Sequence, residues 1–390
     1  RLRLQVALPD GMVPGDLPET VDVYGVEMVH VPDGPFAVGD PRPRGASPKH
    51  SFFRATTDTT AAPPYRITSA GAIPVCDGPG SLCYRRAERS FERGREGDFE
   101  GPIPAAYPNG YGAFYLMKYE VTQGQYAAFL NDVGRCGAPD RTLLGHPDYR
   151  YRGAIEMAEE GYGFVARRPD RTCHYLSWDD AAAFADWAAL RPMTELEYTK
   201  AARGPAAPVA GEFAWGTTTI AHGDTVFAAD GTVAASEAGG DEYVRGNASY
   251  RPVDAETSRL VGGDGSDGVL RVDVFETRAY ALDVDGGANR SRFASRREAS
   301  GAGYYGTIGL SGSLSERVIT ATDAAGRRFQ GTHGDGRLGY PASADVDDWP
   351  GPRGAGLGMR GGSDGRPPSF LQVADRTFGS YALYYRGGGF

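Results

Sequence analysis

This chain of 390 residues has no apolar run approaching the ~20 residues that a membrane-spanning helix needs. It also has few lysines, because the basic residues are arginines everywhere except at Lys49, Lys118 and Lys200. The net charge is −9, and the arginines are dispersed along an acidic chain. Such a charge pattern gives no reason to expect a surface for a phosphate backbone. The sequence therefore predicts neither a membrane span nor a nucleic-acid partner.

Cysteine is scarce too, with four in the whole chain. Cys76 and Cys83 flank a short glycine-containing loop, and Cys136 and Cys173 flank a polar insertion. Neither pair has the C-x-x-C spacing that is typical of zinc or thioredoxin-type sites. We expect two disulfides, Cys76–Cys83 and Cys136–Cys173, and hence an extracellular or cell-surface protein. Four buried free thiols are the alternative.

Common catalytic and metal-binding motifs are missing as well. The sequence has no P-loop, no G-x-S-x-G elbow and no G-x-G-x-x-G that follows a strand. The six histidines are scattered and include no H-x-x-x-H pair. Aspartate-rich loops at 262–267 and 283–289 lack the spacing and the terminal glutamate of an EF-hand.

The clearest structural signal is a pair of helices within residues 176–204. Ser177 with Asp180, and Thr194 with Glu197, have the spacing of capping boxes at the two helix starts. A proline between them ends the first helix near residue 190, and Gly204 is placed to end the second. This stretch predicts two helices that turn around a proline.

The rest of the chain reads as short strands, one further helix and long loops, which predicts an α+β fold. A strand is expected at 114–120, followed by a helix capped by Thr122 with Gln125. Further strand-like runs lie within 21–38 and at 317–321, 370–374 and 381–385. Residues 1–20 are expected to be an extension or a linker from an upstream domain, and 21–390 one domain with loop insertions at about 40–112, 136–172 and 217–300.

The segment SWDDAAAFADWAALRPMTELEYTKAARG resembles the central signature of the formylglycine-generating enzyme (sulfatase-modifying factor) family. Segments 28–39 and 114–131 resemble the family's opening strands and first strand–helix unit. Segments 309–317 and 358–363 resemble its G-L-x-x-x-G-N-x-W-E-W and R-G-G-S blocks. The resemblance implies a C-type-lectin-like fold with few helices, small twisted sheets and many ordered loops.

The same resemblance implies that the chemistry of the family has been lost. Formylglycine-generating members use two cysteines just after the R-G-G-S block to hold copper, but here no cysteine follows Cys173. The family's calcium site uses an asparagine and a glutamate of the other block, where this chain has Ser313 and Glu316. We therefore predict no catalytic residue and no cofactor, with calcium at Glu316 as the open alternative.

The sequence thus predicts a non-catalytic, secreted or cell-surface protein that binds a partner or assembles into a surface layer or filament. Its binding surface is expected near the C-terminal end, because tyrosine and arginine are enriched at interfaces; the residues are Tyr381, Tyr384, Tyr385 and Arg386. One set of these tyrosines belongs to the core in an alternative interpretation. A glycan-binding lectin-like module and a metal-dependent oxidoreductase of the family are the alternative functions.

Overall fold

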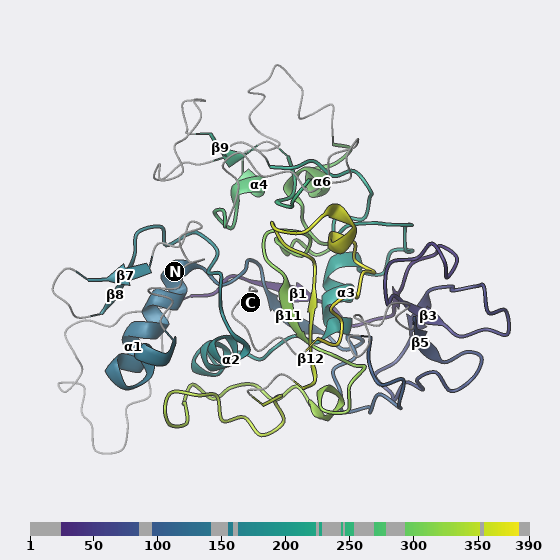
Figure 1. Ribbon diagram of the computed structural model, residues 1–390, viewed down its shortest axis with the longest axis horizontal. Helices are drawn as coiled ribbons and strands as arrows, with labels where there is room; N and C mark the ends of the chain where they lie inside the picture. Colours follow the sequence, from purple (N-terminus) through teal and green to yellow (C-terminus); the bar gives the residue numbers. More distant parts are fainter. Residues whose placement is uncertain are drawn as a thin grey trace.

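The computed structural model describes residues 25–85, 96–141, 155–158, 163–223, 226–227, 243–244, 246–252, 269–277, 293–351 and 355–381, with the backbone alone at 135–141, 226–227 and 243–244. Figure 1 shows short strands and a few helices that are joined by long loops. None of the helices in these ranges is both long and apolar enough to cross a membrane.

The strands of the described ranges pair two by two, and each pair is antiparallel. Two of the pairs are β1 (Met28–Val31) with β6 (Phe114–Met117), and β11 (Glu316–Ile319) with β12 (Leu357–Arg360). The other pairs are β2 (Phe36–Val38) with β4 (Tyr65–Ile67), β3 (Phe52–Arg54) with β5 (Leu82–Tyr84), β7 (Ile155–Met157) with β8 (Phe164–Ala166), and β9 (Val226–Phe227) with β10 (Tyr243–Val244). These small sheets, together with a few helices, confirm the predicted α+β class.

Both central helices begin at the predicted capping boxes. The Ser177 hydroxyl accepts the amide of Asp180, whose carboxylate accepts the amide of Ser177, at the start of α2 (Trp178–Trp187). Thr194 and Glu197 exchange the same two hydrogen bonds at the start of α3 (Glu195–Arg203). Gly204 follows α3 with a φ of 64°, a conformation that favours glycine. Local sequence therefore determined where both helices begin and where α3 ends, whereas α2 ends at Trp187, before the predicted position near residue 190.

The remaining described helices are one longer helix and four short segments. Thr122 and Gln125 form the predicted reciprocal cap of α1 (Gln123–Arg141), which is interrupted by a non-helical conformation at Gly134. Four short helical segments complete the described helices: α4 (Val274–Thr277), α6 (Arg296–Ser300) and the 3-10 helices η4 (Gly326–Arg328) and η5 (Pro368–Leu371).

Helix α3 lies at the centre of the molecule, and each of its nine residues is buried. Its first residue, Glu195, is paired with Arg376 at 2.7 Å and Arg360 at 3.1 Å, and all three side chains are almost fully buried. A buried carboxylate is stable only when its charge and its hydrogen bonds are satisfied. Arg360 therefore connects α3 to β12, and Arg376 connects α3 to the segment that follows β12. Figure 1 shows α3 beside β12.

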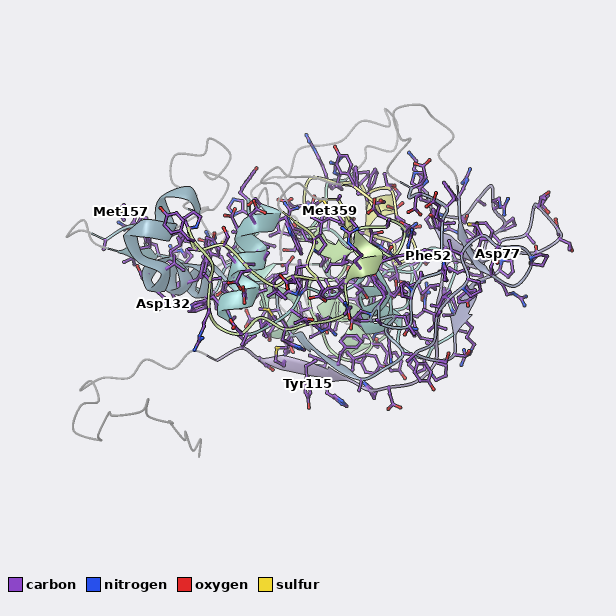
Figure 2. The ribbon with its side chains drawn as sticks, turned by 90° about the horizontal axis from the view of Figure 1, so that it is seen from below. Phe52, Asp77, Tyr115, Asp132, Met157 and Met359 are labelled. Carbon is purple, nitrogen blue, oxygen red and sulfur yellow. A yellow bond between two sulfur atoms is a disulfide. The ribbon has the colours of Figure 1, made fainter. Side chains whose placement is uncertain are left out.

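Three apolar clusters surround these central elements. One packs Trp178 and Leu196 against strands β2 to β5, a second gathers around Tyr198 and Val318, and a third joins α1 to α2 through Phe129 and other aromatic rings. Figure 2 shows side chains filling the interior between these elements. The core is therefore built from segments that are far apart in the chain.

Two segments differ from the sequence-based expectation. Residues 40–112 were expected to be a loop insertion, but they supply β3, β4 and β5 and buried side chains such as Phe52 and Ile103. Residues 370–374 were expected to be a strand, but they begin inside η5. Pro367 is the N-cap of that turn and Pro368 is its first residue, and their fixed φ angles favour it over a strand.

The two predicted disulfides have different outcomes. Cys76 and Cys83 are bonded, at opposite ends of the loop next to β5. Cys173 is a buried free thiol within the cluster that joins α1 to α2, so the predicted Cys136–Cys173 disulfide is wrong. The Cys136 side chain lies outside the described residues. Cys173 follows the rule that a free cysteine packs as a small apolar residue.

Candidate functional site

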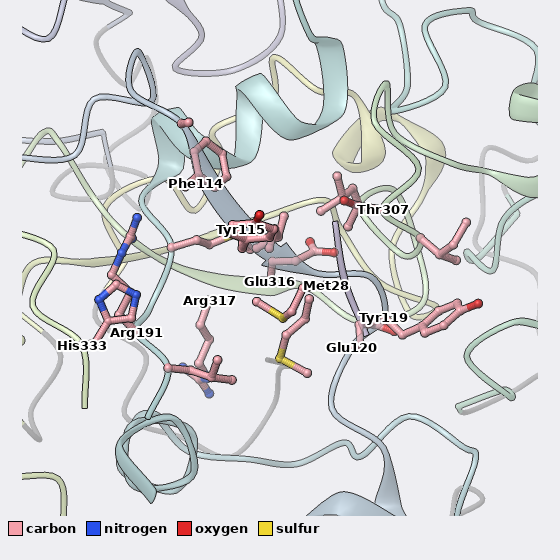
Figure 3. A pocket seen from close by; sticks show the side chains of 17 residues that line it. Met28, Phe114, Tyr115, Tyr119, Glu120, Arg191, Thr307, Glu316, Arg317 and His333 are labelled. Atoms are coloured by element: carbon pink, nitrogen blue, oxygen red, sulfur yellow. The ribbon is translucent and has the colours of Figure 1, made fainter. Parts of the chain in front are cut away.

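A pocket of about 320 Å³ lies between the β1–β6 pair, the start of β11 and the loops at 190–193 and 307–310. Pockets of this size hold small molecules, and their walls are mostly apolar with a few polar groups. Figure 3 shows the side chains that line it. Its apolar walls include Met28, Phe114, Leu116, Met117, Ile308 and Leu310.

Glu316 lines this pocket from the first position of β11. It is 5% exposed, and neither of its carboxylate oxygens has a hydrogen-bond partner among the described residues. Burial raises the pKa of Glu316 well above its ordinary value, and the neighbouring carboxylate of Glu120 adds to this effect. Arg360, opposite Glu316 in the β11–β12 pair, favours the ionised form, but the effect of burial is larger, so the Glu316 side chain is a buried acid with a raised pKa.

Gly361 of the R-G-G-S block leaves the space that the Glu316 carboxylate occupies. A Cβ atom at Gly361 would lie 2.1 Å from a carboxylate oxygen of Glu316, and the residue has a φ of +80°. A side chain at this position would be strained and would displace the carboxylate. The glycine therefore leaves room for Glu316 across the β11–β12 pair.

Glu120 enters the same pocket between β6 and the cap of α1. Its carboxylate accepts the amide of Leu314 at 3.1 Å and the hydroxyl of Thr172 at 3.2 Å. Burial raises the pKa of Glu120 to about 8 even though these hydrogen bonds favour the ionised form. Two acids with raised pKa values thus line one apolar pocket.

Other polar groups divide between two sides of the pocket. Thr307 is 2% exposed, and its hydroxyl has no partner within the described part of the chain. Arg191 and His333 lie on the side opposite Glu120 in Figure 3. Arg191 is paired with Glu197 at 2.5 Å, and burial followed by the Arg191 charge lowers the pKa of His333.

This arrangement is suited to holding a positive charge. The carboxyls of Glu120 and Glu316 and the hydroxyl of Thr307 all present oxygen atoms to the pocket. Any hydrogen-bond donor or cation that enters would satisfy groups that are now buried without sufficient partners. The apolar walls exclude water and strengthen such a contact.

The structure separates the residues that the sequence had singled out. Glu316 is in the pocket, whereas Tyr381 is half-buried elsewhere with its ring 5.4 Å from that of Phe378. That contact fits the core interpretation of Tyr381. Tyr384, Tyr385 and Arg386 lie outside the described residues, so the predicted tyrosine surface stays a prediction.

Sequence reasoning missed Glu120 and Thr307. Glu120 is the last residue of the strand predicted at 114–120, shortly before the α1 cap at Thr122, and Thr307 lies in a glycine-rich loop. A charged residue at the apolar end of a strand was the only available signal for Glu120. No spacing in the sequence predicts that Glu120 or Thr307 lies near Glu316.

The residues present do not fit the copper of the family. Residues 364–381, after the R-G-G-S block, contain no cysteine, and η5 with its prolines occupies the segment instead. Burial, with a smaller contribution from Asp180, raises the pKa of the Cys173 thiol well above its ordinary value. Copper(I) requires thiolates, and this thiol is held in the opposite protonation state.

A calcium ion has few ligands at Glu316. Calcium takes six to eight oxygens, while the side chains that line the pocket offer two carboxyls and the hydroxyls of Thr307, Tyr115 and Tyr119 among apolar walls. Ser313, at the position of the family's asparagine, is hydrogen-bonded to Glu120 instead. Arg317, which also lines the pocket, donates to the carbonyl of Leu176 at 2.8 Å.

A second acidic group lies away from this pocket. Asp186, Asp335 and Asp345 bring their carboxylates within 4.8 Å of one another, and it is the one group of at least three metal-ligating side chains in the described ranges. The Asp186 oxygens already accept the amides of Asp335 and Asp345, each at 3.1 Å. The three residues are explained as a support for the loop that follows β11.

Comparison with known proteins places residues 79–282, just over half of the chain, in the sulfatase-modifying factor enzyme 1-like domain. A protein of Streptomyces coelicolor named formylglycine-generating enzyme is 29% identical over 173 residues, which cover 35% of this chain and 54% of that protein. The protein of that name from Thermomonospora curvata is 32% identical over 129 residues, covering 27% of this chain and 42% of the relative. The bovine protein of that name is 26% identical over 115 residues, covering 24% and 31%. The chain therefore spans about half the length, or less, of the curated relatives it matches.

Proposed function

Because this chain belongs to the sulfatase-modifying factor enzyme 1-like family, we propose that it uses the family's C-type-lectin-like scaffold to bind a ligand and does not generate formylglycine. The pocket between β1–β6 and β11 is the proposed binding site. The curated relatives are named as enzymes, so the proposal assigns this chain a different activity from theirs.

The observation that carries the proposal is the lack of any cysteine after Cys173. The family scaffold is kept around the R-G-G-S block, where Gly361 still makes room for Glu316. The thiol pair that would hold copper is replaced by a segment with prolines and Leu371, which is fully buried. A fold can persist while the reactive groups grafted on it change.

The proposal includes an extracellular or cell-surface location. The Cys76–Cys83 disulfide supports it, because such bonds persist in oxidising compartments. Asn247, of the N-x-S sequon at 247–249, is 1% exposed and hydrogen-bonded to Ala221 and Glu298, so it is not an accessible glycosylation site in the folded chain. The proposed location therefore rests on the disulfide.

An aldehyde assay tests the proposal. The purified chain, given a cysteine-containing sulfatase-type peptide with copper and reductant, is expected to form no aldehyde. The Streptomyces coelicolor relative in the same assay is the positive control, and mass spectrometry of the peptide is the readout. Catalytic turnover by this chain would overturn the proposed function.

A further inference from the structure

We propose that the pocket binds an organic cation, a primary ammonium group attached to an apolar body, with the ammonium held by Glu316, Glu120 and Thr307. This inference deepens the proposed function, because it names the ligand class of the same pocket. The carrying observation is that Glu316 is 5% exposed, lines the pocket and has no hydrogen-bond partner for either oxygen within the described ranges.

The cations near this end of the pocket have other partners, including Arg360, whose charge opposes the rise in the pKa of Glu316 but which is paired with Glu195 at 3.1 Å. Arg317 donates to the carbonyl of Leu176, and Arg191 is paired with Glu197. Lys118, which is adjacent to the residues of the pocket, is paired with Glu276 at 3.1 Å and with Glu27 at 3.2 Å. A bound cation would therefore favour the ionised form of the two acids, whose pKa values burial raises.

The number and type of polar groups match an ammonium. A primary ammonium has three donors and no acceptor. Five oxygen-bearing side chains line the pocket. Tyr119 donates to Glu276 and Tyr115 is 66% exposed, which leaves Glu316, Glu120 and Thr307 for these donors (Figure 3). A hydrogen bond from a cation to a carboxylate is among the strongest in proteins.

The remainder of the pocket selects an apolar body. Phe114, Leu116, Met28 and Ile308 provide a surface that gains stability from covering aliphatic or aromatic carbon. A hydrated metal ion would bring water against these side chains and find few further oxygen ligands. An alkylammonium satisfies both the acids and the walls.

A series of three probes of similar length tests the ligand class on the wild-type chain. n-Hexylammonium, hexan-1-ol and hexanoate share the apolar chain and differ in the charge of the head group. Hexylammonium is expected to bind saturably, and about tenfold or more tightly than hexan-1-ol or hexanoate. Isothermal titration measures the three dissociation constants.

Methionine methyl groups report where the probe binds. Met28, Met117 and Met193 line the pocket, whereas Met157 lies on β7 near α1, away from Tyr115 in Figure 2. In a chain labelled with carbon-13 at its methionine methyls, hexylammonium is expected to shift the pocket resonances and leave that of Met157 unchanged.

Two isosteric variants test the head-group contacts. Glu316→Gln removes the charge without changing the shape and is expected to weaken hexylammonium about tenfold, while hexan-1-ol binding is unchanged. Thr307→Val is expected to weaken hexylammonium by about threefold. Glu156→Gln, an exposed acid of β7 paired with Arg167, is the matched control and is expected to leave all three probes unaffected.

Several outcomes would overturn the inference. These are equal affinity for the three probes, no saturable binding of hexylammonium up to about 10 mM, or methyl shifts confined to Met157. Tight calcium binding that is lost in Glu316→Gln, without hexylammonium binding, would assign the site to a metal instead. Because the aldehyde assay uses a different readout, failure of this inference can be told apart from failure of the proposed function.

Discussion

At the scale of single residues, the acid at the start of β11 has an unusual environment. Glu316 is buried with unsatisfied oxygens, and Gly361 leaves the space it occupies. Natural proteins retain such groups mainly where binding or catalysis uses them, because they reduce stability. We therefore expect the buried acid to lower the free energy of unfolding of the ligand-free protein by a measurable amount.

Replacing Glu316 by glutamine is expected to stabilise the ligand-free protein at neutral and alkaline pH. Below the ordinary pKa of 4.5, the acid is protonated in the folded and the unfolded chain and contributes no pH dependence. Above it the unfolded chain releases the proton and the folded chain keeps it, so the free energy of unfolding falls as the pH rises. Urea unfolding should show a gain of about 1–3 kcal/mol for Glu316→Gln at about pH 8.

The same variant provides its own control, because the gain should disappear near pH 4, where the wild-type acid is protonated in both states. Glu156→Gln, on an exposed acid, should show no gain at either pH. A loss of stability for Glu316→Gln at the higher pH would contradict the assignment of a neutral buried acid.

Removing the Cys76–Cys83 disulfide is expected to destabilise the chain moderately. The two residues are 7 apart in sequence, and closing so short a loop restricts the unfolded chain by about 2–3 kcal/mol in the chain-entropy model. The double variant Cys76→Ser with Cys83→Ser should show this loss in urea unfolding without reductant. Added reductant should destabilise the wild type but not the variant; an equal effect on both would contradict the prediction.

At the scale of elements, α3 organises the centre through its charges as much as through its apolar side. Glu195 binds Arg360 of β12 and Arg376, and Arg203 at the other end is paired with Glu212 at 2.5 Å. Each arginine also donates to a backbone carbonyl, which adds to the charge pairing in the interior. The helix is thus held at both ends by buried ion pairs.

Glu195→Gln is expected to destabilise the protein strongly. The change leaves Arg360 and Arg376 buried without the carboxylate that balances them, and breaking a buried pair in this way costs about 3–5 kcal/mol. Thermal unfolding followed by circular dichroism measures the loss. Glu156→Gln removes one partner of an exposed pair and should cost less than about 1 kcal/mol. Similar effects from the two variants would contradict the role of the buried network.

At the scale of the whole molecule, the proposal extends to assembly through the C-terminal tyrosines. Tyr381 is half-buried against Phe378, and the other residues of that predicted surface lie outside the described ranges. The expected outcome is ordered oligomers or fibres in electron microscopy and a concentration-dependent mass in sedimentation. A strictly monomeric protein with measurable affinity for a polysaccharide would favour the lectin-like alternative instead.

The sequence by itself determined the local structure of this protein and its family scaffold. Ser177, Thr194 and Gly204 set the ends of α2 and α3, because caps and stops depend on residues only a few positions apart. The lack of cysteine after Cys173 likewise excluded the copper pair without any knowledge of the fold.

Only the tertiary structure decided which distant residues meet. Glu120 and Glu316 are separated by about half of the chain, and no periodicity links them, so their shared pocket depends on how β6 and β11 pack. The same holds for Cys173, which spacing had paired with Cys136 but which packing buries as a free thiol. Hydrophobic packing is non-directional and long-range in sequence, whereas caps and turns are local, and that difference separates what could be predicted from what could not.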